Sequence, residues 1–133
     1  MEQAAPKEVE RLELRTQATP AAVPDVRRAV VAFAELHGVG NGPDVALAVS
    51  EAITNAVLHA YRHRSGGPVR VVACVESDRL VVVVRDYGCG MSPNPDSPGL
   101  GLGLSVIGRL VTELNIERPD DGGTRLRMCF AAE

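Results

Sequence analysis

The pattern of apolar and polar positions along the chain predicts helices and strands separated by turns rich in glycine and proline. Helices are expected where apolar residues recur every three or four positions, and strands where β-branched residues dominate a short run between turn residues. In chain order, the predicted elements are strand Val9–Thr16, helix Asp25–His37, helix Asp44–Tyr61, strands Val69–Glu76 and Leu80–Arg85, helix Leu104–Glu113, and strands Leu114–Arg118 and Thr124–Phe130.

The order of these elements decides the expected fold class. Strands and helices do not alternate regularly, which argues against a doubly wound parallel sheet. We therefore expect an α+β fold: a two-layer α/β sandwich with three helices on one face of a mixed, mostly antiparallel sheet. A chain of 133 residues has the length of one domain. We expect residues 1–8 to form a flexible N-terminus and residues 9–133 to form that domain.

Composition and charge argue against several classes of function. Hydrophobic residues make up 45% of the chain, and the longest apolar run is six residues, whereas a bilayer span needs about 20. The net charge of −3 and the aromatic content of 3% disfavour nucleic-acid binding. The sequence opens with no signal-peptide pattern, and its three cysteines form no paired motif. We therefore expect a cytoplasmic protein with no direct nucleic-acid or membrane partner.

Polar side chains follow one stripe of the second predicted helix. Glu51, Asn55 and His59 recur every four residues, apart from the apolar side that must face the core. A solvated surface explains such a stripe when this helix is considered alone. The functional alternative is a cation site, in which the Asn55 amide oxygen is a hard ligand for magnesium and the Glu51 carboxylate orients or deprotonates a hydroxyl. The apolar side comprises Val45, Val49, Ala52, Ile53, Ala56 and Ala60.

A buried strand leads directly into the sequence Asp86-x-Gly88-x-Gly90. An Asp at the end of a strand can point its carboxylate into a pocket, while the glycines let the backbone pass close to a flat ligand. Because a carboxylate only accepts hydrogen bonds, it selects a ligand edge with an N–H, such as the exocyclic amine of adenine. A glycine-rich turn with a capping Asp is the simpler alternative.

A second glycine-rich segment, Gly99-x-Gly101-x-Gly103, leads into the third predicted helix. The free N–H groups and the positive dipole end of a helix N-terminus suit a phosphate group. The segment lacks the lysine of a P-loop and the βαβ surroundings of a dinucleotide-binding motif. By itself, this segment is weak support for a phosphate site.

Together these motifs resemble those of the GHKL ATPase superfamily, which uses the Bergerat ATP-binding fold. The resemblance covers about residues 9–131, and residues 50–61 are most similar to the anti-sigma-factor serine kinases of the RsbW and SpoIIAB type. The matching motifs are, in order, Glu51-x-x-x-Asn55, Asp86-x-Gly88-x-Gly90, Gly99-x-Gly101-x-Gly103 and Gly122-Gly123-Thr124.

The resemblance implies a role for each matching residue. Glu51 matches the general base, Asn55 the magnesium ligand, and Asp86 the carboxylate that recognises adenine. Thr124 resembles a threonine that helps to hold adenine, although a β-branched strand residue is an equally good explanation of it. The glycines implied to bind the nucleotide are Gly88 and Gly90 beside the base, and Gly99, Gly101 and Gly103 near the phosphates.

The implied cofactors are ATP and Mg²⁺, and the implied activity is that of a serine/threonine protein kinase. By resemblance, the protein is a homodimer that sequesters a sigma factor and phosphorylates a STAS-type antagonist of the anti-sigma factor. The alternative is an ATP-binding regulatory module that acts by nucleotide-dependent protein binding without phosphoryl transfer. A histidine-kinase catalytic domain would need a helical hairpin with a phosphoacceptor histidine, and a gyrase-type ATPase would need a transducer domain.

The sequence departs from this family in the segment that forms an ATP lid in its relatives. Between Met91 and Gly99 there are seven residues, three of them proline, where the family generally has a longer segment. Prolines make such a segment stiff and remove N–H donors that could reach a phosphate. We therefore expect modest, rapidly exchanging nucleotide binding.

Overall fold

The computed structural model describes residues 10–61, 66–88 and 100–132. Within these ranges, five strands and three α-helices follow one another in the predicted order, and a short π-helix, η1, extends the second α-helix. The elements are β1 (Arg11–Gln17), α1 (Ala22–His37), α2 (Gly42–Asn55), η1 (Ala56–Ala60), β2 (Pro68–Glu76), β3 (Arg79–Asp86), α3 (Leu100–Leu110), β4 (Glu113–Glu117) and β5 (Thr124–Phe130).

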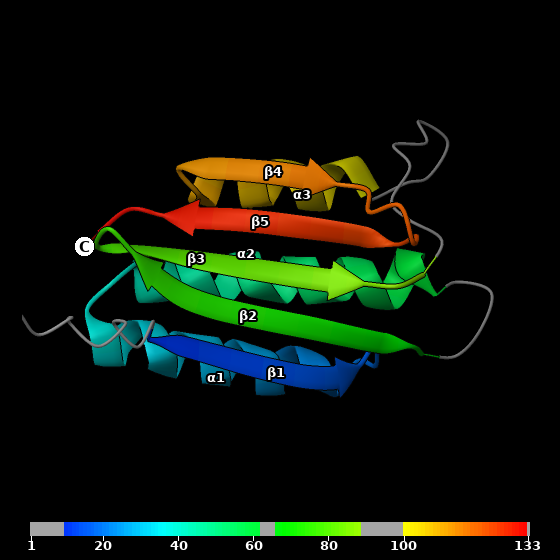
Figure 1. Cartoon of the computed structure of the whole chain (residues 1–133), viewed down its shortest axis with the longest axis horizontal. Coiled ribbons are helices and arrows are strands. Elements are labelled where there is room, and N and C mark those ends of the chain that lie inside the picture. The colour runs from blue at the N-terminus through cyan, green and yellow to red at the C-terminus, as the bar shows by residue number, and fades with distance from the viewer. Residues whose placement is uncertain (1–9, 62–65, 89–99, 133) are drawn as a thin grey trace, which may run out of the picture.

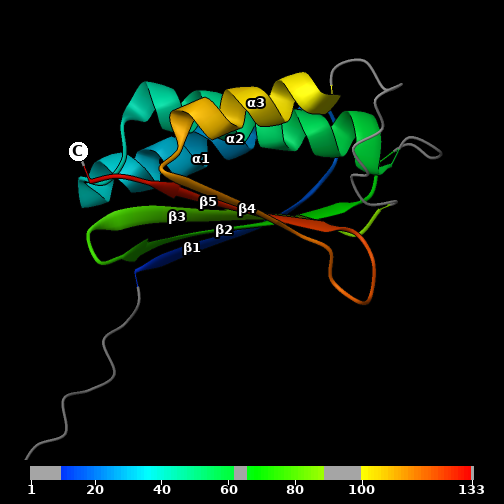
Figure 2. The same cartoon turned by 90° about the horizontal axis from the view of Figure 1, so that it is seen from above.

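The strands form one sheet in the order β1-β2-β3-β5-β4. Figures 1 and 2 show that α1, α2 and α3 all cover the same face of this sheet, so the expected two-layer α+β sandwich is confirmed. Every pairing among the described strands is antiparallel. The sheet is therefore more regular than the mixed sheet that was expected.

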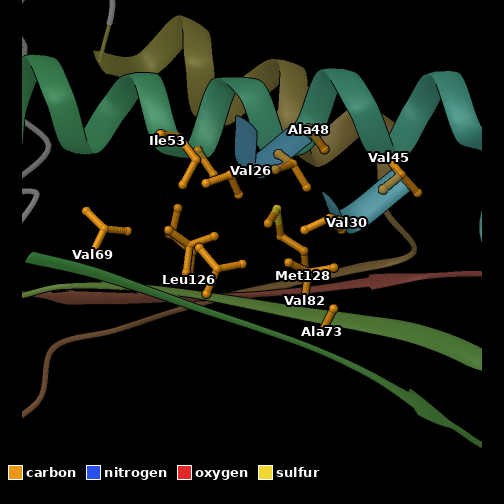
Figure 3. Close-up of a cluster of buried hydrophobic side chains, with 14 of the residues drawn as sticks. Val26, Val30, Val45, Ala48, Ile53, Val69, Ala73, Val82, Leu126 and Met128 are labelled. Carbon is orange, nitrogen blue, oxygen red and sulfur yellow. The ribbon is translucent and has the colours of Figure 1, made fainter. Parts of the chain in front are cut away.

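The core fills the space between the helices and the sheet (Figure 3). Successive side chains of a strand point to opposite faces, so one alternate set from each strand meets the helices. The whole predicted apolar side of the second helix is buried, from Val45 to Ala60. The fully buried side chains that meet there include Ile53, Val30, Val82, Leu126 and Met128.

The second helix differs from its prediction at both ends. It begins before Asp44, at Gly42, because the Asn41 side chain accepts a hydrogen bond from the Asp44 N–H at 3.2 Å and caps the helix. The prediction of a regular α-helix to Tyr61 is wrong after Asn55, where the chain winds more widely as η1. Single π turns of this kind are frequent at functional sites.

The third helix also begins earlier than predicted, at Leu100 rather than Leu104, and it ends at Leu110 rather than Glu113. The prediction treated Gly101 and Gly103 as residues that precede the helix. They lie in its first turn, where backbone N–H groups have no partner within a helix in any case. Packing of the apolar side of α3 against the core outweighs the low helix propensity of glycine. Glycine is less favourable than alanine in a helix by about 1 kcal/mol per residue.

Short turns of the predicted kind connect the other elements. The first helix ends at Gly38, whose φ of 62° places it in the left-handed region. Ser77 and Asp78 join β2 to β3 with φ of 50° and 64°, the positive values that a tight hairpin turn requires. None of the helices in the described ranges combines the length and the apolar character that crossing a bilayer demands.

Candidate functional site

Buried polar side chains gather at one end of the sandwich. Within the described ranges, they belong to Asn55, Arg85, Asp86 and Thr124. Asp86 ends β3 and lies directly opposite Thr124, which begins β5, while Asn55 ends α2. Figures 1 and 2 show that the ends of α2 and β3 and the beginnings of β5 and α3 lie at the same end of the molecule. The structure therefore brings together three site residues that the sequence predicted.

The carboxylate of Asp86 belongs to the helix-covered face of the sheet and is 4% exposed. Its Oδ1 atom accepts a hydrogen bond from the Gly88 N–H at 3.1 Å. Burial is the largest influence on this group and raises the pKa of Asp86 above its ordinary value. Hydrogen bonds from the backbone of Gly88 and Thr124 and the charge of Arg85 act in the opposite direction. Asp86 is thus a buried acceptor suited to a ligand that carries an N–H group.

Asn55 is the most unusual of the buried polar residues. Its side chain belongs to a residue that is 3% exposed, and its Nδ2 atom has no hydrogen-bond partner among the described residues. An unpaired buried polar group costs about 1–3 kcal/mol, so most such groups in native proteins have a partner. Glu51, one helical turn earlier, is half-buried. A buried N–H donor without a partner suits a ligand that brings a hydrogen-bond acceptor to the end of α2.

Two glycines permit close backbone approaches around Asp86. A Cβ atom on Gly88 would overlap the Ala60 carbonyl group at the end of η1, and a Cβ atom on Gly123 would overlap the Asp86 carbonyl group. Gly123 also has a φ of 80°, which L side chains rarely adopt. Gly88 therefore has a packing role that the sequence interpretation did not assign. It lets the exit of β3 lie directly against the helical layer.

Tyr61 is a site residue that the sequence interpretation missed. Its hydroxyl donates a hydrogen bond to the Pro68 carbonyl oxygen at 2.6 Å and accepts one from the Tyr87 N–H at 2.8 Å. These bonds connect the end of η1 with the beginning of β2 and the exit of β3. The only sequence signal was an amphipathic side chain at the end of a helix, which is common and unspecific.

Arg85 is the second missed residue. Its Nε atom donates to the Asp86 carbonyl oxygen at 3.1 Å, and its Nη2 atom donates to Asp121 Oδ1 at 3.0 Å and to the Gly122 carbonyl oxygen at 2.9 Å. Its guanidinium carbon lies 4.5 Å from the centroid of the Tyr87 ring. Arg85 thus joins the β4–β5 turn to the strand end that carries Asp86. A charged residue directly after four valines was the available signal.

The glycine-rich motif before α3 is described in part. Gly101 and Gly103 lie in the first turn of the helix, where backbone N–H groups are free to bind an anion. Gly90, Gly99 and the short proline-rich segment between them lie outside the described residues.

This set of groups fits a nucleotide. Asp86 supplies a buried acceptor, the first turn of α3 supplies N–H donors, and Asn55 supplies a buried amide whose unpartnered Nδ2 atom is a further donor. A cation would be bound by the oxygen of that amide, not by Nδ2. One amide is only part of a magnesium site, because Mg²⁺ in proteins usually completes its shell with water and substrate phosphates. These are the features of a domain that binds a nucleoside triphosphate at the end of an α+β sandwich.

Comparison with known proteins agrees with that class. A family model described as "Histidine kinase-like ATPase domain" matches residues 16–130, so the chain belongs to this family. This match confirms the predicted membership of the GHKL superfamily.

Similar proteins include the anti-sigma F factor of Clostridium novyi (strain NT), 33% identical over 96 residues that cover 64% of this chain and 67% of the relative. The anti-sigma F factor of Clostridium acetobutylicum is 34% identical over 96 residues, which cover 64% of this chain and 66% of the relative. The chain spans about two thirds of the length of these relatives. Their names agree with the predicted anti-sigma-factor branch.

Proposed function

We propose that this protein is an anti-sigma factor with serine/threonine protein kinase activity, which uses ATP and Mg²⁺ to phosphorylate a STAS-type antagonist. The observation that carries the proposal is the gathering of Asn55, Asp86 and Thr124, all buried, at one end of the fold. The names of the similar anti-sigma F factors support the choice of a sigma factor as the sequestered partner.

The proposed binding mode assigns the two ends of the nucleotide to different elements. The Asp86 carboxylate accepts a hydrogen bond from the exocyclic amine of adenine, and Thr124 contributes from the facing strand. The N–H groups at Gly101 and Gly103 bind phosphate oxygens, while the Asn55 amide oxygen is a ligand of Mg²⁺. When bound, Mg²⁺ neutralises charge that develops on the phosphates during transfer.

The proposed chemistry needs one proton acceptor from this chain. Glu51 lies one turn before Asn55 on α2, so its carboxylate is close to the residue that holds the cation. In the proposal, a Glu51 carboxylate oxygen takes the proton of the attacking serine or threonine hydroxyl. Phosphoryl transfer otherwise depends mainly on positioning and charge compensation.

Radioactive phosphate transfer tests the proposal directly. The full chain is mixed with Mg²⁺, γ-labelled ATP and a candidate STAS antagonist, and the labelled antagonist is followed over time. Glu51→Gln should slow transfer about a hundredfold or more, the usual contribution of a general base, with little change in ATP affinity. Glu35→Gln, an exposed glutamate on α1, is the matched control and should transfer at the normal rate.

The result also separates the two functions that the sequence left open. Transfer that depends on Glu51 supports the kinase. ATP binding without transfer to any antagonist would instead assign a module that regulates by nucleotide-dependent binding alone.

We also propose that the protein is a homodimer. In the described sheet β1 is an edge strand, and edge strands are templates for pairing with another chain. Light scattering at micromolar concentration should give about twice the 14.1 kDa mass of one chain. A mass equal to that of one chain would contradict the dimer.

A further inference from the structure

A hollow of about 630 Å³ lies where β1 ends and β2 begins. Its lining includes Arg15 and Gln17 from β1, Pro68 and Arg70 from β2, and Tyr87 after β3. Arg15 and Arg70 alternate along their strands with residues that pack against the helices, so they belong to the opposite, free face of the sheet. The arginines of the hollow therefore lie on the other face of the sheet from the Asp86 carboxylate, and the proposed function does not use them.

An unusual row of like charges crosses the free face beside this hollow. Strand register places Arg15 opposite Arg70, Arg70 opposite Arg85, and Arg85 opposite Arg125. Like charges directly opposite one another destabilise a sheet. Four neighbouring strands thus carry an arginine at the same register position. Carboxylates at other positions must offset the repulsion between them.

The carboxylates that offset this row are unevenly distributed. Arg85 has its own partner in Asp121 at 3.0 Å, and Arg125 donates to Glu117 at 2.8 Å.

Beside the hollow, by contrast, three arginines of the described part of the chain share one carboxylate: Glu13 accepts from Arg11 at 3.2 Å, Arg15 at 3.4 Å and Arg70 at 2.9 Å. The hydrogen bond from Arg70 is the largest influence that holds the pKa of Glu13 below its ordinary value, which favours the ionised carboxylate. Its one negative charge is divided among three arginines. Positive charge is therefore in excess at the hollow.

We propose that this hollow binds a carboxylate side chain on an acidic peptide segment of a partner protein. A guanidinium group offers a planar fork of N–H donors that matches a carboxylate. The Tyr87 ring, 43% exposed and held against Arg85, and the ring of Pro68 add apolar wall for the aliphatic part of such a side chain. Glu13, which bonds Arg70 from the neighbouring strand, disfavours a polyphosphate chain, whose closely spaced charges would meet this carboxylate.

Fluorescence anisotropy of the full chain with a fluorescein-labelled hexaglutamate peptide tests the proposal. Binding should weaken as salt is added, and hexaglutamine with the same label should bind far more weakly. Arg70→Gln and Arg15→Gln should each weaken binding by up to about fivefold, the range for exposed ion pairs. Arg28→Gln removes an exposed arginine of α1 that pairs with Asp25, and it should change nothing.

Removing the negative charge of Glu13 tests the proposal more sharply, because it should raise the affinity for the peptide. Glu13→Gln removes the shared carboxylate, so it should strengthen hexaglutamate binding by about twofold or more. A purely structural role of this cluster predicts no gain from that substitution. Circular dichroism of each variant establishes that the fold is intact.

Three results would overturn the proposal. The first is equal binding of hexaglutamate and hexaglutamine. The second is tighter binding of a labelled oligothymidine of six nucleotides, which would assign the surface to nucleic acid. The third is loss of peptide binding as the protein dimerises at higher concentration, which would assign the hollow to a second copy of this chain.

Discussion

The two faces of the sheet are built from the same strands and have opposite characters. On β3, Val82 and Val84 are buried against the helices, whereas Arg85 reaches the free face and pairs with the β4–β5 turn. The apolar series on the helix-covered face ends at Asp86, with Thr124 opposite. The candidate nucleotide site therefore lies where buried positions stop being apolar, whereas on the free face a polar residue is informative only together with its neighbours, as in the arginine row.

The largest expected effect is on the free energy of unfolding, when one valine of β3 is replaced by alanine on each face of the sheet. Val82→Ala should lower the free energy of unfolding by about 2–3 kcal/mol, because it removes buried methyl groups and leaves a cavity. Val83→Ala, its half-buried neighbour on the free face, should cost about 1 kcal/mol or less. Urea denaturation measures both changes. Equal losses would show that the two faces are packed alike.

Two glycines should respond to alanine with opposite signs. Gly88→Ala places a methyl group on the Ala60 carbonyl, so it should destabilise the fold by about 1–3 kcal/mol. A Cβ atom on Gly108 in α3 would meet nothing within 4 Å, so Gly108→Ala should stabilise the helix by up to about 1 kcal/mol. Thermal melting compares them. An unchanged melting temperature for Gly88→Ala would contradict the close packing of the exit of β3 against η1.

The smallest effect concerns the charge buried at the site. Because the pKa of Asp86 is raised, the folded protein binds more protons there than the unfolded chain. Its contribution to stability therefore decreases as pH rises from 3.8, its ordinary value, through the raised pKa.

Asp86→Asn should accordingly stabilise the nucleotide-free protein at neutral pH, and this gain should shrink as the pH is lowered. Urea midpoints of both proteins across this range provide the measurement. A variant that is less stable than the wild type at neutral pH would contradict the buried-charge account.

Local sequence patterns were sufficient for much of the fold. The boundaries of β5 and the buried side of α2 agree with prediction because periodicity reports directly which side chains face the core. The start of α3 and the π turn after Asn55 could not be predicted in this way, because both depend on packing against distant elements. Helix propensity near glycine is a weak local signal that such packing overrides.

The candidate site was predictable to a similar extent. Asp86 and Asn55 were predicted because their residue types interrupt apolar patterns at motif spacing, whereas Thr124 was predicted only through the resemblance to the GHKL superfamily. Tyr61 and Arg85 were missed because their importance lies in hydrogen bonds to Tyr87 and to the β4–β5 turn. Such contacts join residues that are far apart along the chain, and no local spacing encodes them.

Calorimetric titration of ATP with Mg²⁺ into the wild type and Asp86→Asn tests the central claim most directly. The amide presents an N–H group where the carboxylate accepted one, and losing a charge-assisted hydrogen bond should weaken binding about ten- to a hundredfold. The stability measurements above establish that the variant is folded. Unchanged ATP affinity in a folded Asp86→Asn protein would contradict the assignment of this buried end of the sheet as the nucleotide site.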